Sequence, residues 1–265
     1  MYFPFQLAKK YIRYFISASN GKGHGVHSPF VFDFIENVLN DNRAFYAYER
    51  IENLRGILKK ETEILEVEDF GAGSVVSKTK RRSVKEIAKS ALKPVKFGQL
   101  FFRMVDYYQP KNILELGTSL GITTSYLALA NASASVTTME GSKVIAQVAK
   151  QNFTSLGIQN IQQILGNFDD TLPIFLANTK PLDFVFIDGN HRKQPTLNYF
   201  KQLLPHLHND SIVIFDDVHW SEEMEQAWEI IKQDESVRLS IDLFFIGIVF
   251  FKAEFKVPQH FSIRF

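Results

Sequence analysis

The sequence predicts an α/β fold in which an α-helical N-terminal extension, residues 1–94, precedes a sheet domain, residues 95–265. From about residue 96, short apolar runs alternate with amphipathic segments of helical length, which is typical of a doubly wound parallel sheet. Residues 237–243 and 245–251 form two further strand-like runs that are too close in sequence for a crossover helix. We therefore expect a mostly parallel sheet with an antiparallel last strand.

The first helix is expected near the N-terminus, over residues 5–16. Apolar side chains recur there at helical spacing, with Lys9, Lys10 and Arg13 between them. A basic amphipathic helix of this kind either lies on a membrane surface or docks its apolar stripe on protein. We expect docking, on the same chain or on a partner chain.

Residues that begin or end helices mark some of the later elements. Ser28 and Pro29 supply an N-cap and an N1 proline for a helix that reaches about Leu39. Pro110 ends the helix that precedes the first strand. The other expected helices cover residues 43–60, 97–108, 121–131, 142–155, 169–177, 195–205 and 221–233. The expected parallel strands cover residues 113–116, 136–139, 161–165, 184–187 and 212–215.

The composition is that of an ordinary globular protein, with 45% hydrophobic and 22% charged residues. Because the chain has no cysteine, disulfide scaffolds, thiolate zinc sites, iron–sulfur clusters and cysteine nucleophiles are excluded. The formal charge of +1 gives no overall attraction to nucleic acid, although residues 1–110 carry +6 and residues 111–265 carry −5. The longest apolar run, residues 244–251, is too short to span a bilayer, and we expect a cytoplasmic protein without a transmembrane segment.

A glycine-containing turn follows the first predicted strand of the sheet. The strand runs into Glu115-Leu116-Gly117, and Gly121 opens the next helix. Ligands bind beyond the carboxyl ends of the strands in an open parallel sheet, and glycine lets the backbone approach a ligand closely. About twenty residues later, Glu140 ends the second strand, where a carboxylate accepts hydrogen bonds from ribose hydroxyls. The third strand is followed by Gly166-Asn167-Phe168-Asp169, whose polar and aromatic side chains suit a purine ring.

In this order, the motifs resemble those of the class I S-adenosylmethionine-dependent methyltransferases, over roughly residues 95–251. The resemblance implies a Rossmann-like fold, with the glycine turn around the methionine end of the cofactor. It also implies the acid after the second strand on the ribose, and the residues after the third strand at the adenine. The expected cofactor contacts are Glu115, Gly117, Thr118, Ser119, Gly121, Glu140, Gly141, Asn167, Phe168 and Asp188.

A second glycine-rich segment, Asp69–Ser74, also has the look of a cofactor loop, but no alternation of strands and helices follows it. We interpret it as a structural or substrate-facing loop. The basic segment 78–85 that follows is expected to be a solvated face, with recognition of an anionic substrate or of RNA as the functional alternative.

Acidic residues end two further predicted strands, with Asp188 after the fourth strand and Asp216-Asp217 after the fifth. Neighbouring parallel strands bring these carboxylates to one rim, where they repel one another unless a cation or a proton intervenes. Oxygen ligands of this kind suit Mg²⁺ or Mn²⁺. The alternative is that Asp188 contacts the cofactor and that Asp216-Asp217 only caps a helix or turn.

The resemblance sharpens this prediction, because divalent-cation-dependent O-methyltransferases of the catechol, caffeoyl-CoA and antibiotic-sugar types carry acids at these positions. Asp216-Asp217 is most similar to the sugar type. In the catechol type a lysine three residues after the first acid is the base, whereas here that residue is His191. Histidine, with an ordinary pKa of about 6.5, is suited to proton removal near neutral pH. Asp188, Asp216 and Asp217 are thus the expected metal ligands, with Asp188 and His191 as the expected catalytic residues.

The chain has other histidines that are candidates for the same site. His219 and Trp220 follow the fifth strand directly and either line the substrate entrance or belong to the start of the next helix. His24 and His27 lie in the glycine-rich N-terminal loop, and because no acid accompanies them locally, we do not expect them to bind metal.

The predicted function is methyl transfer from S-adenosylmethionine to a hydroxyl of a small-molecule acceptor that is chelated to Mg²⁺ or Mn²⁺. Two alternatives remain: a metal-independent methyltransferase acting on RNA or protein, and a non-catalytic scaffold that binds S-adenosylmethionine. The N-terminal extension is expected to shape substrate access or a homodimer contact. The identity of the acceptor does not follow from the sequence, because loops form the walls of substrate sites.

Overall fold

The computed structural model describes residues 1–67 and 81–265, which fall into two compact units. Met1–Asp41 and Thr179–Phe265 form the terminal unit, and Asn42–Asn178 belongs to the central unit. These two units are defined by contacts in space. The division into an N-terminal extension, residues 1–94, and a sheet domain, residues 95–265, concerns function and remains a prediction.

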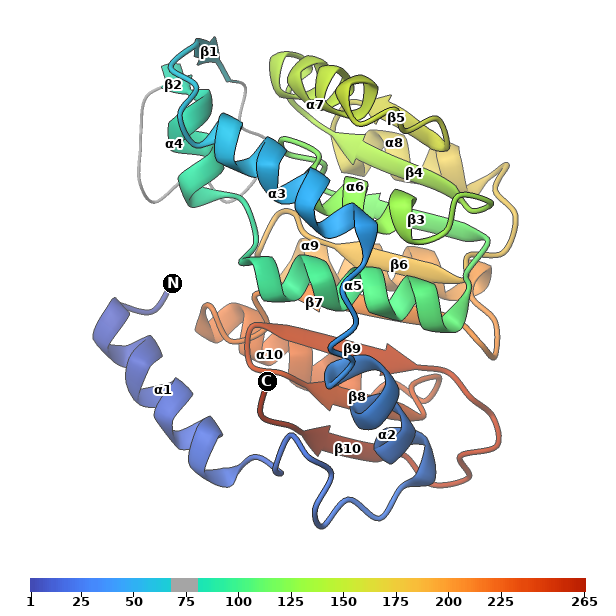
Figure 1. Cartoon of the computed structure of the whole chain (residues 1–265). Coiled ribbons are helices and arrows are strands. Elements are labelled where there is room, and N and C mark those ends of the chain that lie inside the picture. Colours follow the sequence, from blue (N-terminus) through green and yellow to red (C-terminus); the bar gives the residue numbers. More distant parts are fainter. Residues whose placement is uncertain (68–80) are drawn as a thin grey trace. The chain divides into compact units, whose positions relative to one another are not determined.

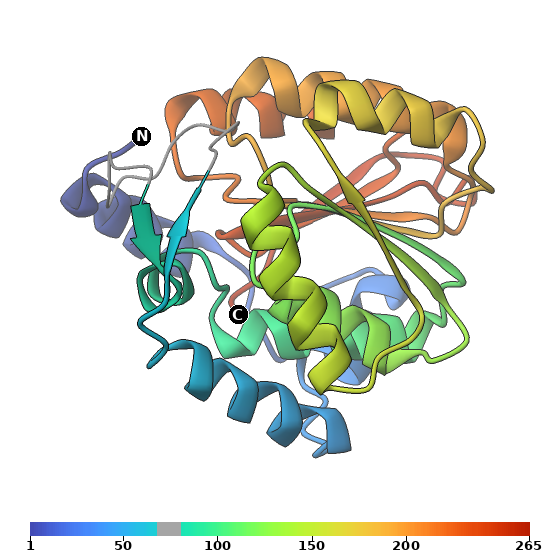
Figure 2. The same cartoon turned by 90° about the horizontal axis from the view of Figure 1, so that it is seen from above.

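The central unit contains three parallel strands, β3 (Asn112–Leu116), β4 (Ser135–Glu140) and β5 (Ile161–Leu165), in that order. Its helices are α3 (Tyr46–Leu58), α4 (Val84–Ser90), α5 (Val95–Tyr108), α6 (Ile122–Ala130), α7 (Lys143–Ser155) and α8 (Phe168–Leu176). Two short antiparallel strands, β1 (Ile64–Glu66) and β2 (Arg81–Ser83), form a separate ribbon. Figures 1 and 2 show the three strands side by side, with α8 on one side of them and α3 and α5 on the other.

The core of the central unit lies under α3, α5 and α6. Tyr126 of α6 is completely buried and packs with Phe102 of α5 and Ile51 of α3 in one apolar cluster. The close approach of α5 to α6 depends on Gly98, because a Cβ there would lie 2.6 Å from the ring of Tyr126. The packing of α5 against α6 therefore stabilises α6, the helix that begins where the loop after β3 ends.

The terminal unit contains five strands in the order β10-β8-β9-β7-β6. They are β6 (Phe184–Ile187), β7 (Ile212–Asp216), β8 (Leu239–Asp242), β9 (Ile246–Phe250) and β10 (Gln259–Ser262). The pairs β6–β7 and β8–β10 are parallel, and β9 is antiparallel to both of its neighbours. The helical segments are α1 (Pro4–Ser17), α2 (Pro29–Phe34), the π-helix η1 (Ile35–Leu39), α9 (Lys193–Leu203), the 3₁₀-helix η2 (Leu204–His206) and α10 (Glu222–Lys232).

Helices cover both faces of the strands in the terminal unit. Figure 2 shows α9 and α10, in orange, along one face. On the other face, the rings of Phe30 and Phe34 from α2 contact Phe250 of β9 at centroid distances of 5.0 and 6.2 Å. The strands β6 and β7, which end at the rim, are fully buried.

The predicted α/β architecture is confirmed: every expected strand and helix is present, and the antiparallel strand is β9. The sequence analysis missed β10, the β1–β2 ribbon and α4. Ser28 takes the N-cap position of α2, but its side chain makes no capping hydrogen bond. The helix that starts at Pro29 continues to Leu39 as η1. None of the described helices is both long and apolar enough to cross a membrane.

A network of buried and half-buried charges joins α10 to the end of β8. Asp242 accepts hydrogen bonds from Trp228 Nε1 at 3.1 Å and from the backbone N–H of Phe244 at 2.8 Å, and His219 Nε2 lies 2.8 Å from its Oδ2. His219 Nδ1 lies 3.1 Å from Glu225. Burial alone raises the pKa of Asp242, but the hydrogen bonds and the charge of His219 outweigh it, so that the pKa is lowered overall. The carboxylate of Asp242 therefore stabilises the folded state.

We predict that Asp242→Asn lowers the free energy of unfolding at pH 7 by about 3 kcal/mol, because one partner of a buried charge pair is lost. Since the folded pKa of Asp242 is depressed, its contribution is present above the ordinary aspartate pKa of about 3.9 and is lost as the pH falls below it. The difference between the two proteins in urea unfolding should therefore shrink on acidification.

The matched control is Asp210→Asn, which removes an exposed carboxylate that pairs with Lys252 at 2.7 Å. We expect this change to cost less than about 1 kcal/mol. Equal losses in the two variants would contradict the importance of the buried network.

Candidate cofactor and metal sites

Three strand ends meet at one rim of the central unit. The parallel register sets Leu116 beside Met139 and Glu140 beside Leu165. The residues that follow, Gly117 and Gly166, are therefore neighbours of Glu140 along the rim. This is the arrangement that the sequence motifs predict, because parallel strands of one sheet end at the same edge.

Glu140 holds the loop that follows β3. Its Oε2 accepts the backbone N–H of Ser119 at 2.9 Å, and its Oε1 accepts the backbone N–H of Ser142 at 2.9 Å. Ser119 has a left-handed backbone with a φ of 47°, which turns the loop back across the end of β4. Glu140 is half-buried, and Gly141 beside it is also partly exposed, so the carboxylate lies at the surface of the rim.

Gly121 is required where α6 begins. Its φ of 77° is left-handed, and a Cβ at this position would collide with the ring of Phe153 from α7. The loop from Gly117 to Gly121 is held further by Asn152, whose Nδ2 donates to the carbonyl of Leu120 at 2.8 Å. The loop therefore has a defined conformation that leaves its backbone close to the rim.

Glu115 is completely buried inside the sheet rather than at the rim. Its Oε2 accepts hydrogen bonds from the hydroxyls of Thr124 and Thr138, the latter at 2.6 Å. The hydroxyls of Thr118 and Thr138 lie 2.6 Å apart. Through these three threonines Glu115 ties the start of α6 and the loop to β4, so its contact with a cofactor remains a prediction.

Asn167 is the N-cap of α8, where its side-chain oxygen accepts the backbone N–H of Asp169 at 3.2 Å. Phe168 is the first residue of that helix and is half-buried. Both residues follow Gly166, whose φ of 142° and contact with Thr171 leave no room for a side chain. The aromatic ring and the amide thus lie at the end of the third strand, at the position expected for an adenine contact.

The pairing of β6 with β7 brings two carboxylates together in the terminal unit. Ile187 of β6 pairs with Phe215 of β7, so the following residues, Asp188 and Asp216, lie next to each other at the ends of neighbouring parallel strands. Asp216 is almost completely buried, with 1% of its surface exposed, and the side chain of Asp188 is 17% exposed.

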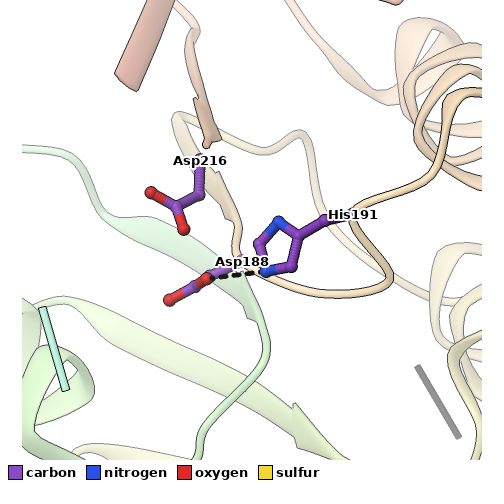
Figure 3. Close-up of side chains that lie close together, drawn as sticks. All are labelled: Asp188, His191 and Asp216. Carbon is purple, nitrogen blue, oxygen red and sulfur yellow. Dashed lines mark ion pairs between the residues drawn. The ribbon is translucent and has the colours of Figure 1, made fainter. Parts of the chain in front are cut away.

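The loop after β6 places His191 close to these two acids. Asn190 has a left-handed backbone with a φ of 55°, and its Nδ2 donates to the hydroxyl of the buried Tyr199 at 3.1 Å. This contact holds the turn, and His191 Nε2 lies 3.6 Å from Asp188 Oδ1. Figure 3 shows the imidazole and the two carboxylates facing a common space.

One ligand atom from each of Asp188, His191 and Asp216 lies within 4.8 Å of the others. In residues 1–67 and 81–265 this is the group of side chains that fits a metal ion. Two carboxylates with an imidazole, at the open rim of a sheet, suit Mg²⁺ or Mn²⁺ and leave positions for other oxygen ligands. The residues present therefore fit the metal that was expected.

Asp217 lies outside this group, although it was expected to be a ligand. β7 ends at Asp216, and Asp217 has a left-handed backbone with a φ of 53°. Its backbone N–H donates to the carbonyl of Phe245 at 2.7 Å, which turns the chain toward β9. The third side chain of the group is His191 instead. The sequence also points to His191, but as the expected base.

The remaining candidates have these positions. His219 is held by Asp242 and Glu225 and stacks on Phe244 at 5.1 Å, so it has structural partners, while Trp220 is half-buried. His24 and His27 are exposed. Asp69–Ser74 lies outside the described residues, as do residues 78–80 of the basic segment. The partners of His219 were missed because Asp242 is more than twenty residues away in sequence.

Parts of the chain are similar to known methyltransferases. Residues 114–218 match the family model described as a methyltransferase domain. The O-methyltransferase imqG from Aspergillus flavus is 31% identical over 134 residues, which cover 48% of this chain and 53% of that protein. A catechol O-methyltransferase from Niastella koreensis is 33% identical over 126 residues, which cover 46% of this chain and 55% of that protein. The chain thus spans about half the length of these curated relatives.

Among solved structures, the fold is similar to that of an O-methyltransferase from Bacillus cereus in complex with S-adenosylhomocysteine. The TM-score is 0.56 at 20% identity, and the match covers 83% of this chain and 97% of that one. The Rossmann-like fold predicted from the sequence is confirmed. Residues 114–218 are thus similar to a methyltransferase domain, and about half of the chain is similar to proteins named as O-methyltransferases.

Proposed function

We propose that the chain transfers a methyl group from S-adenosylmethionine to a hydroxyl oxygen of a small acceptor that binds a divalent cation. The observation that carries this proposal is the convergence of Asp188, His191 and Asp216 at the ends of β6 and β7. The relatives named as O-methyltransferases support oxygen as the methylated atom. The cytoplasmic location remains a prediction.

The central unit would bind the cofactor. The loop with Gly117, Ser119 and Gly121 would surround the methionine end of the cofactor. The Glu140 carboxylate, already directed by two backbone N–H groups, would accept hydrogen bonds from the ribose hydroxyls. Asn167 and Phe168 would contact the adenine. Methyl transfer requires the acceptor oxygen to approach the methyl carbon in line, so fixing both reactants supplies much of the rate.

Asp188 and Asp216 would hold the cation, with Asp217 as a further candidate ligand. A bound divalent cation lowers the pKa of an acceptor hydroxyl and fixes its position. His191 would accept the proton of that hydroxyl, because its ring is directed to the same space and its side chain is 26% exposed. A ligand role for His191 is the alternative that the same geometry allows.

The metal requirement is tested by methyl transfer to catechol with and without EDTA, and by calorimetry with Mn²⁺. We expect EDTA to lower turnover at least about 100-fold, and added Mg²⁺ or Mn²⁺ to restore it, because positioning and activation of the oxygen are lost together. Asp188→Asn and Asp216→Asn should each abolish measurable binding of Mn²⁺.

Asp183→Asn is the matched control, since Asp183 precedes β6 and pairs with His208 at 2.8 Å, away from the rim. This variant should keep the affinity for Mn²⁺. Full turnover in EDTA, or unchanged Mn²⁺ affinity in both rim variants, would disprove the metal site.

The role of His191 is tested by His191→Gln. As a base, His191 contributes about 10²- to 10⁴-fold to the rate, and a loss of activity on acidification that the unsubstituted protein shows should be absent from the variant. The Mn²⁺ affinity should stay within about twofold. A loss of Mn²⁺ affinity with an unchanged pH profile would instead identify His191 as a ligand.

The cofactor site is tested by Glu140→Ala, with binding of S-adenosylmethionine measured by calorimetry. We expect affinity to fall about 10- to 100-fold, because hydrogen bonds to a charged carboxylate are lost. Glu49→Ala is the control: Glu49 is an exposed acid on α3 in the same unit, and the change should leave affinity unaltered. Equal affinity in the two variants would rule out the assignment of Glu140.

A further inference from the structure

Helix α1 exposes an unusual amount of apolar surface. Phe5 and Ile16 are 81% and 72% exposed, and no residue of α1 is buried. The large apolar side chains exposed in and directly before this helix are Met1, Phe3, Phe5, Ile12, Phe15 and Ile16. These residues form what we name the α1 stripe. In Figure 1, α1 is the dark-blue helix that carries it.

The α1 stripe faces away from the rest of the terminal unit. Tyr11 and Tyr14 are half-buried, and their rings contact Phe244 at centroid distances of 5.0 and 5.2 Å. With 3.6 residues per turn, Phe5 and Ile12 lie on the side of the helix opposite to these tyrosines. The sequence analysis expected the apolar stripe to dock on protein. In the contacts of residues 1–67 and 81–265, its tyrosine-bearing flank docks on the terminal unit, and the stripe itself stays exposed.

Polar contacts hold α1 in this orientation. The Tyr2 hydroxyl donates to Glu225 of α10 at 2.7 Å, and Lys10 Nζ pairs with the same carboxylate at 2.9 Å. The Tyr14 hydroxyl also donates to the carbonyl of Ile263. The outward direction of the stripe is thus a fixed property of the unit.

The charge around the α1 stripe is positive. Residues 1–32 contain no Asp or Glu, and Lys9 and Arg13 are exposed beside the apolar side chains. The guanidinium of Arg264 lies over the ring of Phe15 at 4.8 Å and adds a further positive charge. An apolar face with cations along its edge is the pattern of a helix that lies in the interface of an anionic membrane.

We propose that α1 binds the surface of an anionic membrane, with the α1 stripe inserted among the lipid headgroups and with Lys9 and Arg13 at the level of their phosphates. Pairing of the stripe with that of a second copy is disfavoured, because it brings these cations of both copies together without an acid on either helix. The proposal concerns the terminal unit alone and does not depend on the methyltransferase activity.

The test is co-sedimentation of the full chain with vesicles of phosphatidylcholine and with equimolar vesicles of phosphatidylcholine and phosphatidylglycerol. We expect binding to the anionic vesicles that weakens as salt is added. The double substitution Ile12→Ser with Ile16→Ser should weaken this binding at least about tenfold, because apolar area is no longer inserted. Lys9→Gln with Arg13→Gln should weaken it by roughly tenfold, because each cation near the surface contributes.

Val257→Ser with Ile230→Ser is the matched control, since both side chains are exposed apolar residues of the terminal unit outside α1. These substitutions should leave vesicle binding unaltered, and thermal unfolding should show that all variants fold. Absence of binding to anionic vesicles, or binding that is equal in the stripe variant, would overturn the proposal. So would a dimer, seen by sedimentation equilibrium, that the stripe variant abolishes while vesicle binding persists.

Discussion

The parallel register of β6 and β7 is the constraint on which the candidate metal site depends. Ile187 pairs with Phe215, and the next residue on each strand is an aspartate, so the backbones of Asp188 and Asp216 lie side by side. Two carboxylates held close together repel, most strongly where one of them, Asp216, is almost fully buried. A divalent cation relieves this repulsion at the same point where it would hold an acceptor oxygen. The packing that fixes the strands would thus also set the affinity of the candidate site for a cation.

Left-handed residues shape both rims once the strands have ended. Ser119, Asn190 and Asp217 each follow a strand closely and have φ values between 47° and 55°. Each turn directs the chain differently, because a different partner holds it. Glu140 binds the backbone of Ser119, and Tyr199 binds the side chain of Asn190. The carbonyl of Phe245 binds the backbone of Asp217. The first brings backbone N–H groups to the rim, and the second returns an imidazole to it. The third turns the chain away.

The sequence predicts the strands and the acids at their ends well, because buried apolar runs and strand ends are local signals. It does not separate Asp216 from Asp217, since adjacency in sequence says nothing of the turn at Asp217. The place of His191 depends on the contact of Asn190 with Tyr199, nine residues away. The edge strand β10 was missed because it is short, half-exposed and paired with β8 through a contact distant in sequence. The division of roles between Glu115 and Glu140 likewise depends on burial, which the spacing of the motif does not show.

Helix α1 is oriented differently from most amphipathic helices, which bury their apolar side against the protein. Its contacts with the terminal unit are largely polar or aromatic, through Tyr2, Lys10 and Tyr14, while its most apolar side chains face outward. In water this arrangement leaves apolar area exposed that burial would stabilise by about 25 cal/mol per Å². Glu225 is central to it, because the acid binds Tyr2 just before the helix, Lys10 within it and also His219. His219 in turn binds Asp242, so the contacts that fix α1 are continuous with those that hold the chain just after Asp216. An apolar surface that is held outward in this way would suit a neighbour that is itself apolar and negatively charged.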